Sequence, residues 1–322
     1  MKRRTLLLGA LGALAASPAT VAQQPSARGT IGYLHFRTLS ASNTTLIILR
    51  KTWQRLGYVE GQTIHMRAAE GDPSVVPRLA EELVRLGAGV LIVVGAEAVR
   101  AAKGTVPNTP IVAIDLETDP VRAGLAASFA KPGGNVTGLF LDLPSLAGKW
   151  IQLLQELDPR IERVAFSWDA STGRDQLDVA LAVARAMGVH AEVIETTSYD
   201  FAAAFKRVDD SKRTGVVQLT SPGFGTVAGK FAAEAIRRHW PAVGFLKVYA
   251  QLGVPIAYGP NQEDYFARAA DIADRILAGA KAGDIPIEQP TKFELSLNLK
   301  AIRELGIEVP ATLLARADEV IE

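Results

Sequence analysis

Residues 90–115 read VLIVVGAEAVRAAKGTVPNTPIVAID, and this stretch decides the fold class. The run 90–95 is apolar without alternation, which predicts a strand buried on both faces. Residues 96–104 predict a helix that ends at Gly104, and residues 109–115 predict a second strand. A strand, a helix and a strand in this order form a unit whose two strands lie parallel. The stretch therefore predicts an α/β fold.

The same alternation continues along the 322 residues. It predicts strands at 30–34, 135–141, 163–168, 190–196, 215–220, 243–248 and 293–298, and helices at 43–57, 171–187, 199–209, 226–239 and 263–279. Two series of similar length predict two similar doubly wound parallel-sheet lobes joined by hinge crossovers. We expect an N-terminal lobe at 29–140 and a C-terminal lobe at 141–258, with residues 260–322 divided between them.

Residues 119–138, DPVRAGLAASFAKPGGNVTG, connect the two series. Asp119 and Pro120 are typical of a helix start, so the sequence predicts a short helix at 121–131. Pro132, Gly133 and Gly134 then predict a sharp turn into a strand that leads across the lobe boundary.

Composition limits the classes of function. The formal net charge is +1, so there is no electrostatic footprint for nucleic acid, and the absence of cysteine excludes disulfides and thiolate chemistry. Residues 1–22 combine a basic start, an apolar run and a small-residue cleavage site, which predicts a secretory signal peptide. Arg3-Arg4 resembles the twin-arginine type. We expect a periplasmic, monomeric protein.

The sequence contains no complete catalytic or cofactor motif. Residues 223–231, GFGTVAGKF, approach a phosphate-binding loop, but the spacing is wrong and Phe231 stands where a Mg²⁺-binding hydroxyl belongs. The four histidines are scattered and none pairs at metal-ligand spacing. We therefore expect no cofactor, no metal and no catalytic residue.

Polar and aromatic side chains follow several of the predicted strands. Ligands bind outside the carboxyl ends of the strands in open parallel sheets, so these residues are the candidates for a ligand site. The candidates are His35, Phe36, Gly95, Ala96, Glu97, Asp115, Glu117, Trp168, Ser171, Thr220, Ser221, Lys247 and Tyr258.

Several stretches resemble one known family. They are residues 119–138, GYVEGQTI at 57–64, AEELVRLGAGVLIV at 80–93, AYGPN at 257–261 and the whole of 273–322. These stretches are similar to the extracytoplasmic solute-binding proteins of ABC transporters, in the family that includes a tryptophan-binding lipoprotein. The resemblance implies a fold like that of the type I periplasmic binding proteins, with two lobes closing on a small molecule. It also implies a permease in the inner membrane as partner.

The resemblance leaves the ligand open between an aromatic amino acid, an aromatic carboxylate and another small molecule. A hydroxyl-proline turn of the family is replaced here by Gly95-Ala96-Glu97, and Glu117 is an addition. On this hypothesis Phe36, Trp168 and Tyr258 form an aromatic wall, and Ser171, Thr220 and Ser221 donate or accept hydrogen bonds. Glu97 or Asp115 would take a ligand amine.

Two other functions stay open from the sequence. One is an exported α/β enzyme at the same cleft, in which His35 acts with Asp115 or Glu117 as acid and base. The other is a ligand-sensing domain that feeds a receptor.

Overall fold

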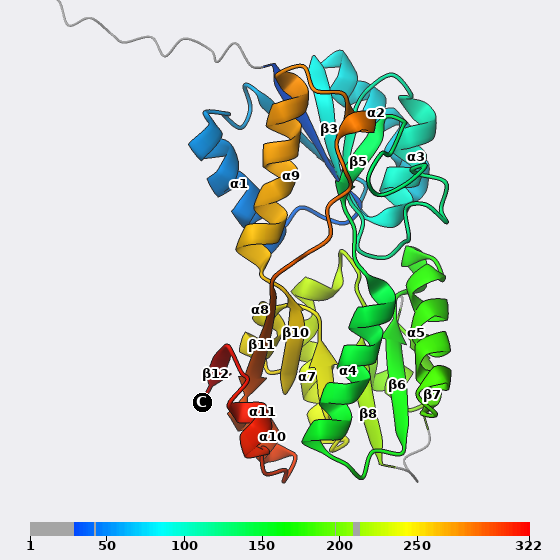
Figure 1. Cartoon of the computed structure of the whole chain (residues 1–322), viewed down its shortest axis with the longest axis vertical. Coiled ribbons are helices and arrows are strands. Elements are labelled where there is room, and N and C mark those ends of the chain that lie inside the picture. Colours follow the sequence, from blue (N-terminus) through cyan, green and yellow to red (C-terminus); the bar gives the residue numbers. More distant parts are fainter. Residues whose placement is uncertain (1–28, 42, 197, 209–212) are drawn as a thin grey trace, which may run out of the picture.

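The computed structural model describes residues 29–41, 43–196, 198–208 and 213–322. The chain forms two α/β lobes, one above the other in Figure 1, each built on its own sheet. The predicted signal peptide at 1–22 lies outside the described residues. Within the described ranges, no helix has the length and apolar character that a membrane crossing needs.

The first lobe contains a five-stranded parallel sheet in the order β2-β1-β3-β4-β5. Its strands are β1 (Thr30–His35), β2 (Ile64–Ala68), β3 (Ala88–Val94), β4 (Ile111–Ile114) and β5 (Val136–Leu139). The central strand β3 is buried at every position except Gly89. Its continuous apolar sequence follows from this burial on both faces.

Helices cover both faces of the first sheet. Helix α1 (Thr44–Leu56) packs along α9 (Gln262–Leu277) over one face. Helices α2 (Val76–Arg85) and α3 (Ala96–Thr105) lie on the other face (Figure 1). Helix α9 comes from the C-terminal quarter of the sequence, yet it packs on β3, β4 and β5.

The second lobe contains a seven-stranded sheet in the order β12-β11-β10-β9-β8-β6-β7. It is parallel except where β11 pairs antiparallel with β10. Its strands are β6 (Arg163–Trp168), β7 (His190–Glu195), β8 (Thr214–Gln218), β9 (Ala242–Gly244), β10 (Ile256–Pro260), β11 (Phe293–Asn298) and β12 (Glu319–Ile321).

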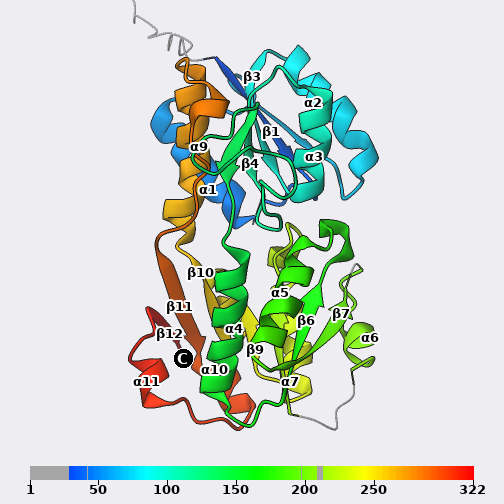
Figure 2. The same ribbon diagram turned by 45° about the vertical axis from the view of Figure 1, so that its right-hand side comes forward.

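The second lobe has three longer helices, α4, α5 and α7, and its other α-helices are short. Helix α4 packs against α5, and α6 packs against α7. Figure 2 shows α4 and α5 side by side on the same side of the sheet. The helices are α4 (Leu143–Leu157), α5 (Asp175–Ala186), α6 (Phe201–Phe205), α7 (Ala228–Arg237), α8 (Lys247–Gln251), α10 (Leu299–Glu304) and α11 (Ala311–Leu314).

The chain passes between the lobes three times, along one side of the molecule (Figure 1). The first passage connects β5 to α4, the second connects β10 to α9, and the third leads from residue 285 into β11. They are bonded to one another: the Phe140 N–H donates to Glu288 O at 3.1 Å, and the Tyr265 hydroxyl donates to Phe140 O at 2.6 Å. The three segments therefore form a single connected hinge region.

The helix predicted at 121–131 is wrong. Asp119 does accept hydrogen bonds from the N–H groups of Val121 and Arg122, at 2.8 and 3.0 Å, as a helix cap would. The turn stops at once because Gly124 adopts a φ of 67°. Residues 115–135 instead form a looped connection into β5.

The strand predicted at 243–248 is wrong after Gly244. Strand β9 ends at Gly244, and helix α8 begins at Lys247. The apolar residues Phe245, Leu246 and Val248 line a cavity instead of extending the sheet. A cavity wall and a buried strand produce the same apolar run, so the sequence pattern did not separate them.

Candidate functional site

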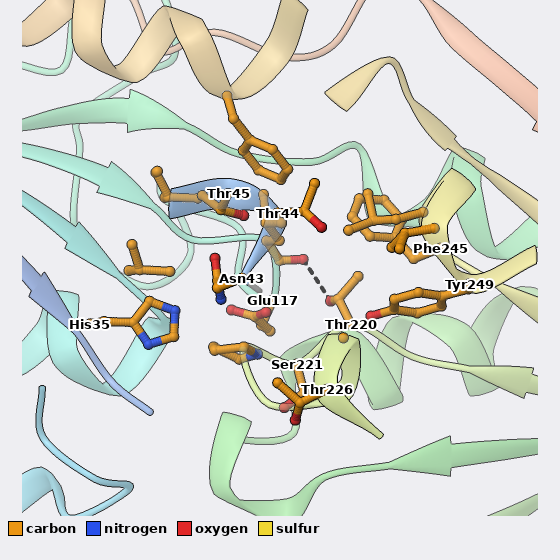
Figure 3. A pocket seen from close by; sticks show the side chains of 18 residues that line it. His35, Asn43, Thr44, Thr45, Glu117, Thr220, Ser221, Thr226, Phe245 and Tyr249 are labelled. Carbon is orange, nitrogen blue, oxygen red and sulfur yellow. Dashed lines mark hydrogen bonds between the residues drawn. The ribbon is translucent and has the colours of Figure 1, made fainter. Parts of the chain in front are cut away.

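A cavity lies between the lobes, where the carboxyl ends of β1 and β4 face the residues that follow β8 and β9. Both lobes line it, as Figure 3 shows. Its volume is about 80 Å³. That is several times the roughly 10–15 Å³ that a cavity needs to hold one water.

Asp115 follows β4 and is buried, but its carboxylate is used within its own loop. It accepts hydrogen bonds from the N–H groups of Glu117 and Thr118, both at 3.1 Å, and from the Thr118 hydroxyl. Burial raises the pKa of Asp115, and these hydrogen bonds oppose the rise. The side chain holds the loop that presents Glu117 and does not line the cavity.

Glu117 lines the cavity and is only 2% exposed. Its Oε2 atom has no hydrogen-bond partner in the structure. Burial is the main cause that raises the pKa of Glu117 well above its usual range, and the charge of Asp115 adds to it. The backbone N–H groups of Leu116 and Ala96 oppose this rise. The carboxyl group therefore lies in the cavity wall, held by backbone N–H groups and with one oxygen that accepts no hydrogen bond.

His35 ends β1 and also lines the cavity. Its Nδ1 atom lies 2.9 Å from the carbonyl oxygen of Arg37 and 3.1 Å from the Arg37 nitrogen. Burial lowers the pKa of His35 from its usual value, so the ring is neutral at pH 7. His35 therefore offers hydrogen bonding but no positive charge to a ligand.

Thr220 and Ser221 line the cavity from the second lobe. The Thr220 hydroxyl lies 3.0 Å from Leu116 O in the first lobe and 2.8 Å from Gln176 Oε1 (Figure 3 draws the bond to Leu116). The Ser221 hydroxyl donates to Asp169 Oδ2 at 2.8 Å. Both protons already have protein acceptors, so these hydroxyls present mainly acceptor oxygens to a ligand.

Asp169, directly after β6, connects the lobes beside the cavity. It is fully buried and accepts hydrogen bonds from the hydroxyls of Ser171, Tyr199 and Ser221, at 2.7, 2.8 and 2.8 Å. Arg37 reaches it from the first lobe, with Nη2 at 2.7 Å from Asp169 Oδ2. Nη2 of Arg37 also donates to Ser171 Oγ at 2.5 Å. This ion pair joins the two lobes.

The rest of the cavity wall is mainly apolar and aromatic, with further polar side chains at the start of α1 and at Thr226. Phe266 contributes from α9, and Phe245 and Tyr249 contribute from the second lobe. Thr44 and Thr45, the first residues of α1, form another part of the lining behind the cap residue Asn43. None of these residues is among the ligand candidates predicted from the sequence. The rule that ligands meet the loops after strands could have found Asn43, Thr44 and Thr45, because their helix follows β1.

Four of the candidates from the sequence line the cavity: His35, Glu117, Thr220 and Ser221. The structure places the aromatic candidates elsewhere. The Trp168 indole donates to Gly173 O at 2.9 Å, under the Arg174 guanidinium. Tyr258 stacks on Phe293 with ring centroids 5.7 Å apart, on the second sheet. Their own partners hold both rings away from the cavity.

The charged candidates Glu97 and Lys247 also lie outside the lining. Glu97, in the first turn of α3, pairs with Arg100. The Lys247 ammonium lies 3.2 Å from Glu319 Oε2 because residues 247–251 form helix α8 and not the expected strand. Each of these two side chains is paired with a protein group of opposite charge and does not line the cavity.

Of the remaining candidates, Gly95 and Ser171 lie where the two lobes meet, and Phe36 and Ala96 are buried within the first lobe. A side chain at Gly95 would approach Phe36 Cβ at 3.0 Å and Pro222 Cγ at 3.1 Å, so the lobes touch here. Phe36 packs in the core of the first lobe, Ala96 is buried at the start of α3, and Ser171 binds Asp169 and Arg37. A ligand role for these residues stays a prediction.

The arrangement is suited to binding. Ser221 is bonded to a carboxylate and not to His35, so the described residues contain no activated serine there. No group of three or more potential metal ligands is present among the described residues.

A family model described as ABC transporter substrate binding protein matches residues 46–321. The tyrosine-binding protein of Clostridioides difficile strain R20291 is 24% identical over 267 residues, which cover 80% of this chain and 75% of that protein.

Solved structures are similar in fold. An ABC domain from Streptococcus pneumonia in complex with L-Trp has a TM-score of 0.80 at 22% identity, covering 91% of this chain and 100% of that chain. The ligand-free, open structure of a substrate binding protein with adhesive properties from Clostridium difficile has a TM-score of 0.63 at 20% identity, covering 91% and 99%. The predicted fold class, two α/β lobes like those of type I periplasmic binding proteins, is confirmed.

Proposed function

This chain belongs to the ABC transporter substrate-binding protein family, and on that premise we propose that it delivers a small organic molecule to the permease of an ABC importer. Members of this family act outside the cytoplasm, and we place this protein in the periplasm, exported by the signal peptide at 1–22. The ligand would be an aromatic amino acid or an aromatic carboxylate, bound between the lobes.

One observation carries the proposal: a cavity between the lobes is lined by residues of both of them. A ligand in this position contacts both halves at once, so it stabilises the closed arrangement over the open one. The aromatic wall supplied by Phe245, Tyr249 and Phe266 suits an aromatic ring. The tyrosine-binding relative and the L-Trp-bound structure support this ligand class.

A ligand screen by thermal unfolding and small-angle scattering tests the proposal. The protein is unfolded and refolded to remove any bound molecule, then mixed with aromatic amino acids, aromatic acids, purines and branched-chain amino acids. A ligand at 100 times its Kd stabilises the folded state by about 2.7 kcal/mol. We expect one class to raise the melting temperature, reduce the radius of gyration and be recovered chemically unchanged. A panel in which no compound compacts the protein would contradict the proposal.

A further inference from the structure

Among the residues that the structure describes, the cavity wall contains one acidic side chain, Glu117, and no basic side chain that could pair with it. None of its lining residues within the described ranges is a lysine or an arginine, and His35 is neutral at pH 7. The charges that act on Glu117 are those of Asp115 and Asp169, and both are negative. The two nearby arginines are already paired, Arg37 with Asp169 and Arg100 with Glu97.

Glu117 differs from the neighbouring acids in having an open acceptor. Asp115 and Asp169 each receive several hydrogen bonds from protein donors. Glu117 Oε2 receives none, although the side chain is 2% exposed and forms part of the cavity wall. A buried polar atom without a partner is costly, so such an atom in a binding cavity marks a place where a ligand donor belongs.

We propose that Glu117 is the anchor for a positively charged amine on the ligand. This inference rests on the proposed function and narrows its ligand class, because it favours an amino acid or an amine over an aromatic carboxylate. An ammonium group supplies both the missing hydrogen-bond donor and the missing positive charge. Figure 3 shows Glu117 in the middle of the cavity, between Asn43 and Thr220, where a ligand bound there also meets the start of α1.

Groups from three elements would surround an amine bound to Glu117. His35 lies on the side of β1, Tyr249 contributes from α8, and the start of α3 lies behind the carboxylate. A carboxylate ligand would bind only if Glu117 were protonated, because two negative charges would otherwise face each other in a buried cavity. The two ligand classes therefore have opposite dependences on pH.

Two sets of three matched compounds test the inference by isothermal titration calorimetry. The first is tyrosine, tyramine and 3-(4-hydroxyphenyl)propionate; the second is leucine, isoamylamine and 4-methylpentanoate. We expect binding of at least one amine-containing compound, tighter at pH 8 than at pH 6, and none of the compound that lacks the amine. The variant Glu117→Gln keeps the shape and removes the charge, and it should weaken that binding on the order of a hundredfold.

Glu263→Gln is the matched control, because Glu263 lies on the surface of α9 in an exposed ion pair with Lys51. It should leave the affinity unchanged. Binding of the amine-free acids, equal affinity in Glu117→Gln, or failure of all the amines would overturn the inference. These outcomes leave the proposed function standing if another compound still compacts the lobes in the scattering screen.

Discussion

Two acids that are two residues apart, Asp115 and Glu117, have opposite roles in this structure. Asp115 turns back onto the N–H groups of its own loop, and Glu117 extends into the cavity. Glu97 or Asp115 was predicted from the sequence to take the ligand amine, and both are engaged with protein partners. Residue type places an acid near the cleft, but only the path of the loop decides which acid faces it.

The buried carboxyl of Glu117 predicts a stability that depends on pH. Its pKa is raised above the usual 4.5, so the folded state binds this proton more tightly than the unfolded state does. The contribution of Glu117 to the free energy of unfolding of the ligand-free protein should therefore fall as pH rises from 4.5 towards the raised pKa. Glutamine has no such proton, so Glu117→Gln should become more stable than the wild type as pH rises.

Thermal unfolding between pH 5 and pH 8 measures this effect. We expect the difference in melting temperature to widen with pH by a few degrees, at about 1.5 °C for each kcal/mol at this chain length. The Glu263→Gln protein should follow the wild type. Identical pH profiles for wild type and Glu117→Gln would show that Glu117 is not buried in the ligand-free state.

At the scale of single elements, β5 carries an unusual constraint at Gly138. This residue has a φ of 137°, and a Cβ atom there would lie 2.1 Å from the carbonyl oxygen of Ala113 in the neighbouring strand β4. Only glycine fits this position without moving a strand. The next segment is the first passage between the lobes, so the constraint also positions the hinge region.

Gly138→Ala should lower the free energy of unfolding by about 3 kcal/mol or more, since it combines backbone strain with a clash in a strand. Urea denaturation measures it. Gly134→Ala is the control, because a Cβ at Gly134 meets nothing within 4 Å and its φ is not positive. Equal midpoints for the two variants would contradict the structural role of Gly138.

Elements with a strong local pattern could be predicted from the sequence. The predicted strands at 163–168 and 293–298 have the bounds of β6 and β11, and the helix predicted at 263–279 is α9 with its end at Leu277. The errors arose where non-local contacts decide. Residues 243–248 became a cavity wall, and β2, with one fully buried residue, has too weak a pattern to be assigned as a strand.

At the scale of the whole molecule, the ion pair of Arg37 and Asp169 stabilises the closed arrangement of the lobes, in which the Asp169 carboxylate is buried. The pair joins the end of β1 in one lobe to the end of β6 in the other. Loss of Arg37 would leave Asp169 buried without its cation only when the lobes are closed, because opening the cleft lets water reach it. The arginine therefore favours the closed state specifically.

Arg37→Ala should weaken ligand binding on the order of tenfold or more, since the closed, binding-competent state becomes less populated. Calorimetry gives the affinity, and small-angle scattering gives the fraction of closed molecules. Arg50→Ala removes an exposed ion pair with Glu60 and should change neither. An Arg37→Ala protein with wild-type affinity would show that the pair does not control closure.

The repeated alternation of strands and helices predicted two lobes, but it did not predict how the last segment is shared between them. Helix α9 packs in the first lobe, and β11 then returns to pair antiparallel with β10 in the second. These pairings join residues far apart in the sequence, so no local pattern contains them.

The return of α9 to the first lobe also sets the order in which the newly made protein can fold. All five strands of the first sheet are complete by Leu139, but the helix that covers β3, β4 and β5 begins only at Gln262. During synthesis, the ribosome must therefore add more than a hundred further residues before that sheet can bury its second apolar face. Until then the nascent chain presents Val90, Ile92 and Val94 to its surroundings, which makes it a client for chaperones that hold unfinished chains.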